Sequence, residues 1–522
     1  MDKSTHKHAA TKGLKVSQAA DINDTSIHLK ADAVVVGSGA GGAVAAYELA
    51  KAGKRVIVLE AGRYLPSEKF PEMLAVSMGM LYQDHGMQAN ADGDITMLQG
   101  ACVGGSTVVN ASVCFRIPDH YLEKWGREFG LTNLSPATMH PYFDRVEHNL
   151  HITACGPKET SPGAELIKKG FAKEGLPEGI AKRNMRDCAL TGFCFSGCAT
   201  DRKQSMLVTY LPWAQAHGAK IYADTHVTKV LAEHGKATGV IAEVIDPDTG
   251  KKKADIRVDA PIVVLAAGAM QTPLLLLRSN LANSSGQVGK NFACHPTLSL
   301  VAEFPDAVDD FHGATHSLFM DRDILPPKPG YLLLNAVQDP VEASIQVGPA
   351  TGKPYLDYMI RYRNTIRLIC LVHDKNNGEI RLENGAKVID YAVNDEDFEI
   401  MKIGLKTTAR VLFGGGASKV RIPATNDLSI NSIDDVDKVI DGLKNERKRY
   451  RYVSFHPQGS CRMGADPKKS VTNPYGETHD VKNLYITDAS LMPTSTGYNT
   501  QESVYALSSY VSDQINKAHA KG

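Results

Sequence analysis

Two short segments near the C-terminus carry side chains that can take part in catalysis. Residues 456–464 read His-Pro-Gln-Gly-Ser-Cys-Arg-Met-Gly, and residues 496–501 read Thr-Gly-Tyr-Asn-Thr-Gln. The imidazole of His456 can exchange a proton near neutral pH, and the amide of Asn499 can donate a hydrogen bond without titrating. The two segments therefore offer an imidazole and an amide to a substrate.

A segment near the other end of the chain has the pattern of a dinucleotide-binding unit. Residues 32–62 read as a strand, a glycine turn, a helix and a second strand. Gly37 permits the tight turn, Gly39 lets a pyrophosphate approach the backbone, and Gly42 lets the helix pack closely on the strand. Glu60 ends the second strand, where it would hydrogen-bond a ribose and repel the extra phosphate of NADP. This βαβ unit does not distinguish FAD from NAD, since both cofactors bind to it. A chain that combines such an N-terminal unit with C-terminal residues in one site is typical of a flavoenzyme.

Four further segments make the prediction more specific. Residues 100–110 (Gly-Ala-Cys-Val-Gly-Gly-Ser-Thr-Val-Val-Asn) and 268–279 (Gly-Ala-Met-Gln-Thr-Pro-Leu-Leu-Leu-Leu-Arg-Ser) resemble the two signatures of the glucose–methanol–choline (GMC) oxidoreductases. Residues 288–296 and 484–490 resemble other segments of the same family. The chain is most similar to the bacterial long-chain alcohol oxidase and dehydrogenase branch.

The resemblance implies an α/β fold (α+β overall), with a Rossmann-like FAD-binding domain and a substrate domain built on an antiparallel sheet with helices. It predicts an FAD-binding domain over 28–295 with a cap-like insertion at about 115–215, a substrate-binding domain over 296–450, and a return to the FAD-binding domain over 451–522. Residues 1–27 are polar and contain no apolar stretch like that of a signal peptide. We therefore expect them to form a flexible N-terminal arm.

The resemblance also predicts how FAD is bound. Ser106, Thr107 and Val108 offer no histidine for a covalent link, so non-covalent FAD is expected. A helix that begins near Thr500 would present its positive end to the flavin and stabilise the negative charge that develops on reduction. The residues expected along the cofactor, beyond those of the first unit, are Gly104, Gly105, Ser106, Asn110, Val227, Asp488, Ala489 and Thr500.

The implied reaction is the oxidation of an alcohol, in which a hydride leaves carbon for flavin N5 as the hydroxyl loses its proton. The resemblance assigns His456 as the base and Asn499 as the second active-site residue. Taken alone, His456 also fits a structural histidine before a turn proline, and His295 is expected to be structural. Two other functions stay open: lyase or decarboxylase chemistry on the same fold, and a non-enzymatic flavoprotein.

The substrate side of the site is less well defined by the sequence. Residues 331–337, with Phe319, Met320, Met359 and Ile360, fit either the core of a sheet or the lining of an apolar pocket. An apolar pocket would suit a long-chain or alicyclic alcohol better than a sugar.

Three cysteines form a second candidate site. Cys188, Cys194 and Cys198 have the C-x5-C-x3-C spacing of the cluster loop in the cytochrome-linked sugar dehydrogenases of this family. If they held an iron–sulfur cluster, the chain would be a sugar or polyol dehydrogenase that passes electrons to a cytochrome or small-subunit partner. The alternative is a set of reduced structural thiols. Zinc is disfavoured because no fourth ligand stands at a matching interval.

The composition excludes several other classes of protein. The 58 basic and 58 acidic side chains balance, which argues against a nucleic-acid partner. No apolar run approaches the roughly 20 residues of a membrane-spanning helix. Nine cysteines, an odd number in a large chain, argue against a disulfide framework. A cytoplasmic location is expected by default; an iron–sulfur cluster would make periplasmic residence by co-export with a partner conceivable.

Overall fold

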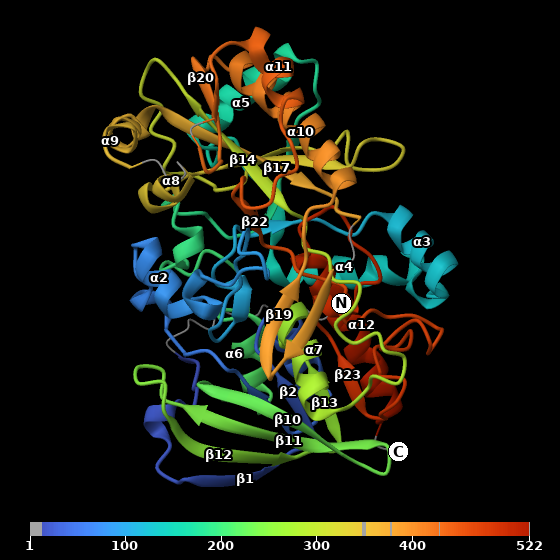
Figure 1. The fold of residues 1–522 in the computed structure, drawn as a ribbon. Helices are drawn as coiled ribbons and strands as arrows, with labels where there is room; N and C mark the ends of the chain where they lie inside the picture. The colour runs from blue at the N-terminus through green and yellow to red at the C-terminus, as the bar shows by residue number, and fades with distance from the viewer. Residues whose placement is uncertain (1–12, 347–350, 376–377, 427, 521–522) are drawn as a thin grey trace.

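The computed structural model describes residues 13–346, 351–375, 378–426 and 428–520. Three sheets follow one another along the molecule (Figure 1). A four-stranded sheet lies at one end, a five-stranded sheet lies in the middle, and a nine-stranded sheet with its helices forms the other end.

The five-stranded sheet is parallel throughout and has the strand order β23-β13-β2-β3-β9. Its four-residue apolar strands are buried on both faces, as expected where helices cover a parallel sheet. Helix α1 (Ala40–Lys51) packs against α6 (Tyr210–Ala216) and α12 (Gln501–Ala518). The strands are β2 (Ala33–Val36), β3 (Val56–Leu59), β9 (Lys220–Tyr222), β13 (Ile262–Leu265) and β23 (Leu484–Ile486).

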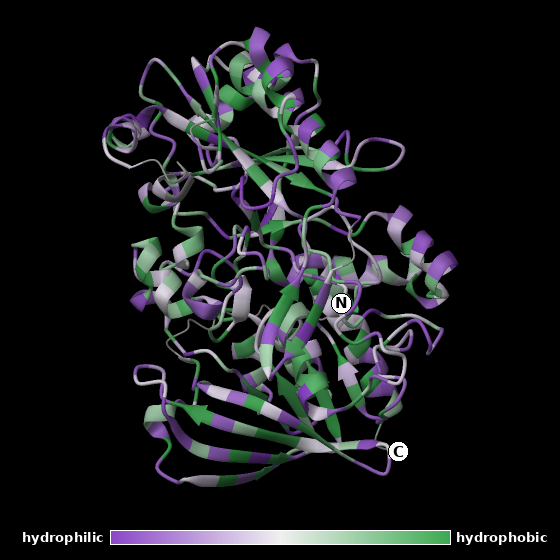
Figure 2. Cartoon of the chain, in the orientation of Figure 1, coloured by the Kyte–Doolittle hydropathy of each residue, from purple (hydrophilic) through white to green (hydrophobic). Residues whose placement is uncertain are grey.

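The hydropathy of the chain follows this arrangement. Strands β2 and β13 are green along their length in Figure 2, whereas the strands of the four-stranded sheet alternate between polar and apolar residues. Alternation is typical of a sheet with one face in water, and continuous apolar strands are typical of a buried sheet. The sheet that carries the dinucleotide-binding turn is therefore part of the main hydrophobic core.

The four-stranded sheet takes its edge strand from the N-terminal region. Strands β10, β11 and β12 form an antiparallel meander, and β1 pairs with β12 in parallel. The bounds are β1 (Ser26–Lys30), β10 (Thr225–Glu233), β11 (Lys236–Ile245) and β12 (Lys252–Asp259).

Residues 13–27 differ from the flexible arm that the sequence predicts. The amide of Ser17 donates to the carbonyl of Ile221 in strand β9 at 3.0 Å. Leu14, Ala19 and Ile22 are buried in the main core. The apolar surface that these residues bury holds the segment against the core. The polar composition around them predicts a flexible arm instead. Residues 1–12 lie outside the described part of the chain.

The nine-stranded sheet is the antiparallel sheet that the resemblance predicts. Strands β14, β17, β16 and β15 pair in antiparallel order, and α10 (Asp395–Gly414) packs on the sheet beside α5 (Pro162–Lys173). The side chain of Asn394 caps α10 by accepting from the amide of Asp397 at 2.7 Å. The strands are β4 (Ile95–Met97), β7 (Gly179–Ile180), β14 (Thr297–Glu303), β15 (Leu318–Met320), β16 (Tyr331–Ala336), β17 (Thr365–Val372), β20 (Lys419–Ile422), β21 (Leu428–Ile430) and β22 (Tyr452–Ser454).

Strands from distant parts of the sequence complete this sheet. Strand β22 pairs with β4 in parallel, and β7 pairs with β15, so the sheet also uses residues before 295 and after 450. The domain boundaries at these two positions stay predictions. The fold class itself, a Rossmann-like domain joined to an antiparallel sheet with helices, is confirmed.

Smaller elements surround the three sheets. Two short sheets and seven further α-helices are found in the described residues, apart from short 3-10 turns: β5 (Val113–Cys114), β6 (Ile152–Ala154), β8 (Lys182–Asn184), β18 (Glu379–Glu383), β19 (Ala386–Asp390), α2 (Leu74–Leu81), α3 (Asp119–Phe129), α4 (Pro136–Leu150), α7 (Gly268–Ser279), α8 (Pro340–Gln346), α9 (Lys353–Ile360) and α11 (Val436–Asp441).

Candidate active site

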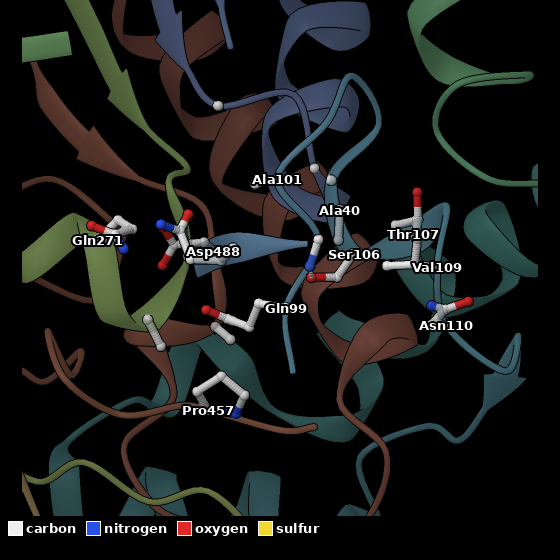
Figure 3. Close-up of a pocket in the computed structure, with 18 of the residues that line it drawn as sticks. Ala40, Gln99, Ala101, Ser106, Thr107, Val109, Asn110, Gln271, Pro457 and Asp488 are labelled. Carbon is white, nitrogen blue, oxygen red and sulfur yellow. Dashed lines mark hydrogen bonds between the residues drawn. The ribbon is translucent and has the colours of Figure 1, made fainter. Parts of the chain in front are cut away.

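A cavity of about 660 Å³ runs from the glycine turn after β2 to strands β16 and β17. It is therefore lined by residues from the start, the middle and the end of the chain. Figure 3 shows part of it, with Ser106 and Asn110 on one side and Asp488 and Gln271 on the other. The predicted site residues that line it are Gly37, Gly39, Glu60, Gly105, Ser106, Asn110, Val227, His456, Asp488, Ala489, Asn499 and Thr500.

Gly42 and Gly104 support the cavity without lining it. A Cβ on Gly42 would lie 2.0 Å from the carbonyl oxygen of Gly37, so only glycine lets α1 approach the turn. Gly104 has a φ of +97° and precedes the segment that enters the cavity. Both glycines therefore shape the backbone on which the nucleotide would lie.

The carboxylate of Glu60 closes the nucleotide end. It accepts hydrogen bonds from the amide and hydroxyl of Ser38, at 2.9 and 2.7 Å, and from the amide of Gly62 at 2.8 Å. Burial raises the pKa of Glu60 in spite of these hydrogen bonds. Each carboxylate oxygen has a second lone pair, so Glu60 can still accept from a ribose hydroxyl.

Asp488 holds two backbone segments together beside the cavity. Its Oδ2 accepts from the amide of Gly268, at 2.9 Å, and from the hydroxyl of Thr272, at 2.5 Å. Its Oδ1 accepts from the amide and hydroxyl of Ser490. Asp488 thus orients the start of α7 and the turn at Ala489, both of which face the cavity.

Helix α12 begins at Gln501, close to the position that the sequence predicts, with Thr500 as its N-cap residue. Thr500 and Gln501 both line the cavity. Gln501 was not predicted; its Oε1 accepts from Nδ2 of Asn110 at 2.7 Å and so joins the helix to the segment after the first signature. The positive end of the helix dipole is therefore directed at the cavity.

His456 and Asn499 lie together at the other end of the cavity. Nδ2 of Asn499 is 3.0 Å from Nε2 of His456, and both residues line the cavity. Burial, with a smaller effect of His295, lowers the pKa of His456 well below its ordinary value. The imidazole is therefore neutral in this site.

His295 lies behind His456, outside the cavity. Its Nδ1 is 3.3 Å from Nδ1 of His456, and its Nε2 accepts from the amide of Gly497 at 2.9 Å. Burial lowers the pKa of His295 well below its ordinary value. The sequence predicts only a structural role for His295. Its contact with the ring of His456 joins two residues that are 161 positions apart in the sequence.

His316 is a cavity residue that sequence reasoning missed. Its Nδ1 is hydrogen-bonded to the carbonyl oxygen of Asn335, and the ring lines the same cavity as His456. No motif surrounds this histidine, so no signal in the sequence marks it.

The cavity wall around His456 and His316 is largely apolar. Phe195 and Phe455 stack at a centroid distance of 6.2 Å and an interplanar angle of 18°, and both line the cavity. Leu334, Ile369 and Leu371 come from β16 and β17 and line the same end. Leu334 belongs to the 331–337 segment that the sequence considers for an apolar pocket.

The other residues considered for that pocket lie elsewhere. Met320 is buried in the core of the nine-stranded sheet. Ile360 is 69% exposed on α9, and Phe319 and Met359 pack against smaller groups of buried residues. The apolar lining is therefore provided mainly by strands β16 and β17 and by the two stacked phenylalanines.

The three clustered cysteines do not form a metal site in this structure. The guanidinium of the buried Arg183 lies 3.9 Å from Sγ of Cys188 and 3.3 Å from Sγ of Cys194. Sγ of Cys198 instead accepts from the amide of Lys203 at 3.4 Å. Within the described ranges, no three His, Cys, Asp or Glu side chains are placed to hold a metal ion together. The positively charged guanidinium of Arg183 lies where iron would need to bind to these two thiols. It therefore disfavours the iron–sulfur cluster that the cysteine spacing suggests.

The cysteine loop instead packs against the cavity wall. The buried ammonium of Lys203 donates to the carbonyl oxygens of Val108, Asn110 and Cys194, at 2.8, 2.6 and 2.7 Å. Burial lowers the pKa of Lys203 to about 8. Burial acts to raise the pKa of the Cys194 thiol, but the cations of Arg183 and Lys203 together bring it below its ordinary value.

The described helices offer no candidate for crossing a membrane, since none combines sufficient length with sufficient apolar character.

The fold and the cavity define a class of protein, the FAD-dependent oxidoreductases. The sequence matches a family model described as "FAD binding domain" over residues 32–80. Two models described as "GMC oxidoreductase" match residues 78–297 and 374–508. The chain belongs to the GMC oxidoreductase family.

Relatives of known sequence agree with this assignment. Long-chain-alcohol oxidase FAO4B of Arabidopsis thaliana is 29% identical over an alignment 542 positions long, which covers 97% of this chain and 70% of that protein. An uncharacterized GMC-type oxidoreductase of Mycobacterium tuberculosis is 30% identical over an alignment 491 positions long, which covers 93% of this chain and 76% of that protein.

Solved structures share the fold at lower sequence identity. Formate oxidase of Aspergillus oryzae matches with a TM-score of 0.71 at 17% identity, over 94% of this chain and 99% of that one. Pyridoxine 4-oxidase from Mesorbium loti matches with a TM-score of 0.67 at 19% identity, over 94% of this chain and 99% of that one.

Proposed function

We propose that this enzyme oxidises an alcohol CH–OH group to an aldehyde or ketone with non-covalently bound FAD. The observation that carries the proposal is the pair His456 and Asn499, which lies at the end of a cavity whose other end is the dinucleotide-binding turn. The names of the long-chain-alcohol oxidases among its relatives support it. When bound, FAD supplies the hydride acceptor, N5 of its ring.

The protein side chains would handle the proton and orient the substrate. The amide of Asn499 can donate to the alcohol oxygen, and an imidazole can take the hydroxyl proton. The sequence motif assigns that proton to His456, and His316 is a second imidazole on the same cavity. Phe195 and Phe455 would exclude water from the reacting carbon, which strengthens each of these interactions.

The substrate that best suits the cavity is an apolar alcohol. Leu334, Ile369 and Leu371 line the end near His456, and the aromatic pair adds further apolar surface. Burying each CH2 group of a chain or ring against such a wall is worth about 0.8 kcal/mol. A long-chain or alicyclic alcohol would gain from this, whereas a sugar would leave its hydroxyl groups without partners.

The experiment is anaerobic reduction of the flavin by a set of alcohols. Holoenzyme is mixed without oxygen with 1-octanol, 1-dodecanol, cyclohexanol or sorbitol, and flavin absorbance near its visible maximum is followed. Bleaching by the apolar alcohols at lower concentrations than sorbitol supports the proposal. Preferential bleaching by sorbitol would favour a sugar or polyol dehydrogenase, and no bleaching by any alcohol would favour another flavin chemistry or a non-enzymatic flavoprotein.

A further inference from the structure

A buried carboxylate that takes no part in the proposed chemistry lies behind His456 and Asn499. Asp374 follows strand β17 by two residues and is 2% exposed. Its Oδ2 accepts from the amide of Cys294 at 2.9 Å, and its Oδ1 accepts from the amide of His295 at 3.3 Å. A carboxylate is buried at low cost only where several donors surround it. Asp374 therefore fixes the backbone of the segment that leads into β14.

The same carboxylate binds the loop that carries Asn499. The hydroxyl of Ser495 donates to Oδ1 of Asp374 at 2.7 Å. Two residues further on, the amide of Gly497 donates to Nε2 of His295 at 2.9 Å. Together with the hydrogen bond from the amide of His295 to Asp374, these contacts close a ring. The ring joins the end of β17, the segment before β14 and the loop before α12.

The backbone of His295 adopts a conformation that is uncommon for a residue with a Cβ. Its φ is +52°, in the left-handed region. Such a conformation persists where the surroundings fix it, and here Asp374 holds the amide of His295 while Gly497 holds its ring. Nδ1 of His295 then lies 3.3 Å from Nδ1 of His456. A displacement at Asp374 is therefore transmitted to the imidazole of His456 through one intervening ring.

The loop from Ser495 to Asn499 has a second anchor outside this ring. The hydroxyl of Tyr498 donates to Oδ2 of Asp321 at 3.1 Å. This contact keeps the loop attached when the hydrogen bond of Ser495 is removed. Ser495 therefore adjusts the position of Asn499, and the loop does not depend on it for folding.

We propose that Asp374 is a positioning residue for the alcohol oxidation. It fixes the imidazole of His456 through His295. It fixes the amide of Asn499 through Ser495. This inference deepens the proposed function and rests on it. A misplacement of about 1 Å in an active site can cost about 100-fold in rate, and one buried carboxylate here determines the backbone on both sides of the pair.

Two substitutions distinguish positioning from stability, because each removes one hydroxyl from the same carboxylate. Ser495→Ala removes the donor to Oδ1, and Tyr391→Phe removes the donor to Oδ2, which lies 2.9 Å from the hydroxyl of Tyr391. Each oxygen keeps one backbone amide in either variant. Both hydroxyl-bearing residues are buried, so similar losses of stability are expected. Ser495 belongs to the loop that carries Asn499, whereas Tyr391 follows β19.

The first measurement needs no turnover. Holoenzyme of each variant is examined by amide hydrogen exchange with mass spectrometry, and peptides that cover residues 495–499 are compared. Exchange there should be faster in Ser495→Ala than in Tyr391→Phe, because the loop loses a hydrogen bond in the first variant alone. If Ser495→Ala exchanges these amides as slowly as the unchanged enzyme, Asp374 does not hold the loop and the proposal is wrong.

The second measurement is anaerobic flavin reduction by the alcohol that works best. Ser495→Ala should lower the limiting rate by about 10-fold to 100-fold, with FAD retained and the apparent alcohol affinity little changed. Tyr391→Phe should keep the limiting rate of the unchanged enzyme. Asp374→Asn should be slower than either, because its NH2 group cannot accept from one of the two backbone amides.

The outcomes separate this proposal from the proposed function. Equal losses of rate in Ser495→Ala and Tyr391→Phe would show that the carboxylate contributes stability alone, and would overturn its positioning role. An unchanged limiting rate in Ser495→Ala would overturn it too, and both results would leave alcohol oxidation intact. If no alcohol reduces the unchanged enzyme, the proposed function fails, but hydrogen exchange still decides whether Asp374 holds the loop.

Discussion

Gly39 and Gly105 are 66 residues apart in the sequence, yet a Cβ on Gly105 would lie 2.6 Å from the Cα of Gly39. The turn after β2 and the first signature segment are thus in backbone contact. Both residues line the cavity, so the nucleotide end of the site is formed where these two glycine segments meet.

Gly105→Ala should therefore abolish FAD binding. The methyl group would push the two segments apart, and a φ of +56° adds strain of about 1 kcal/mol or more for a residue with a Cβ. The measurement is the ratio of flavin to protein absorbance after purification. Gly93→Ala is the matched control, because Gly93 also has a positive φ (+74°) but has no atom within 4 Å of the added group. Equal loss of FAD in both variants would show that strain alone, and not close approach, is responsible.

Asn499→Leu should slow flavin reduction without releasing FAD. The amide touches His456 and lines the cavity, where it would donate to the alcohol oxygen. Loss of one donor to a reacting oxygen typically costs about 100-fold in rate. Stopped-flow reduction under anaerobic conditions gives the limiting rate and the apparent alcohol affinity separately. A change in affinity alone, with the limiting rate preserved, would contradict the assigned position of the amide.

Lys203→Met should destabilise the protein and weaken FAD binding. The substitution removes the donor from the buried carbonyl oxygens of Val108 and Asn110, each at a cost of about 1–3 kcal/mol, whereas the carbonyl of Cys194 keeps the amide of Gly197. Thermal unfolding and flavin content should both decrease, because two of these carbonyls, of Val108 and Asn110, belong to the segment along the cavity. Lys236→Met, at an exposed position on β11, should change neither.

The anaerobically purified enzyme should contain flavin and far less than one iron per chain. Arg183 lies beside Sγ of Cys188 and of Cys194, where a cluster would need to bind. Iron is counted against flavin by elemental analysis, and an electron-spin-resonance spectrum is recorded. About three or four irons per flavin would restore the cluster that the cysteine spacing suggests.

Stability should decrease between about pH 4.5 and pH 8 because of Glu502. Burial, and then the neighbouring Glu147, raise the pKa of Glu502 to about 8. Between these two pH values the folded protein keeps the proton on Glu502, whereas the unfolded chain has released it. The free energy of unfolding therefore decreases as pH rises from the pKa of the unfolded state to that of the folded state. Glu502→Gln should reduce this decline, seen as a smaller drop in the unfolding temperature from pH 5 to pH 8. Glu446→Gln, at an exposed position, should show the wild-type dependence.

The sequence by itself determined the class of protein and the local geometry of its motifs. Gly37 turns the chain at a positive φ, Gly42 lets α1 approach that turn, and Glu60 follows β3, as their spacing predicts, because a turn, a helix start and a strand end are local structures. The ribose contact expected of Glu60 stays a prediction. His456 and Asn499 carry motifs specific enough to be singled out together.

Only the tertiary structure decided what surrounds the two motif residues. His316 has no motif and reaches the cavity through strands paired across the nine-stranded sheet. His295 meets His456 because segments 161 residues apart are packed together. The cysteines have the spacing of a cluster, yet Arg183 lies beside two of them. The spacing of residues in the sequence limits how far apart their backbones can lie. It does not determine the partner of a buried polar group, because that partner is a residue, often distant in the sequence, that the fold brings within hydrogen-bonding distance.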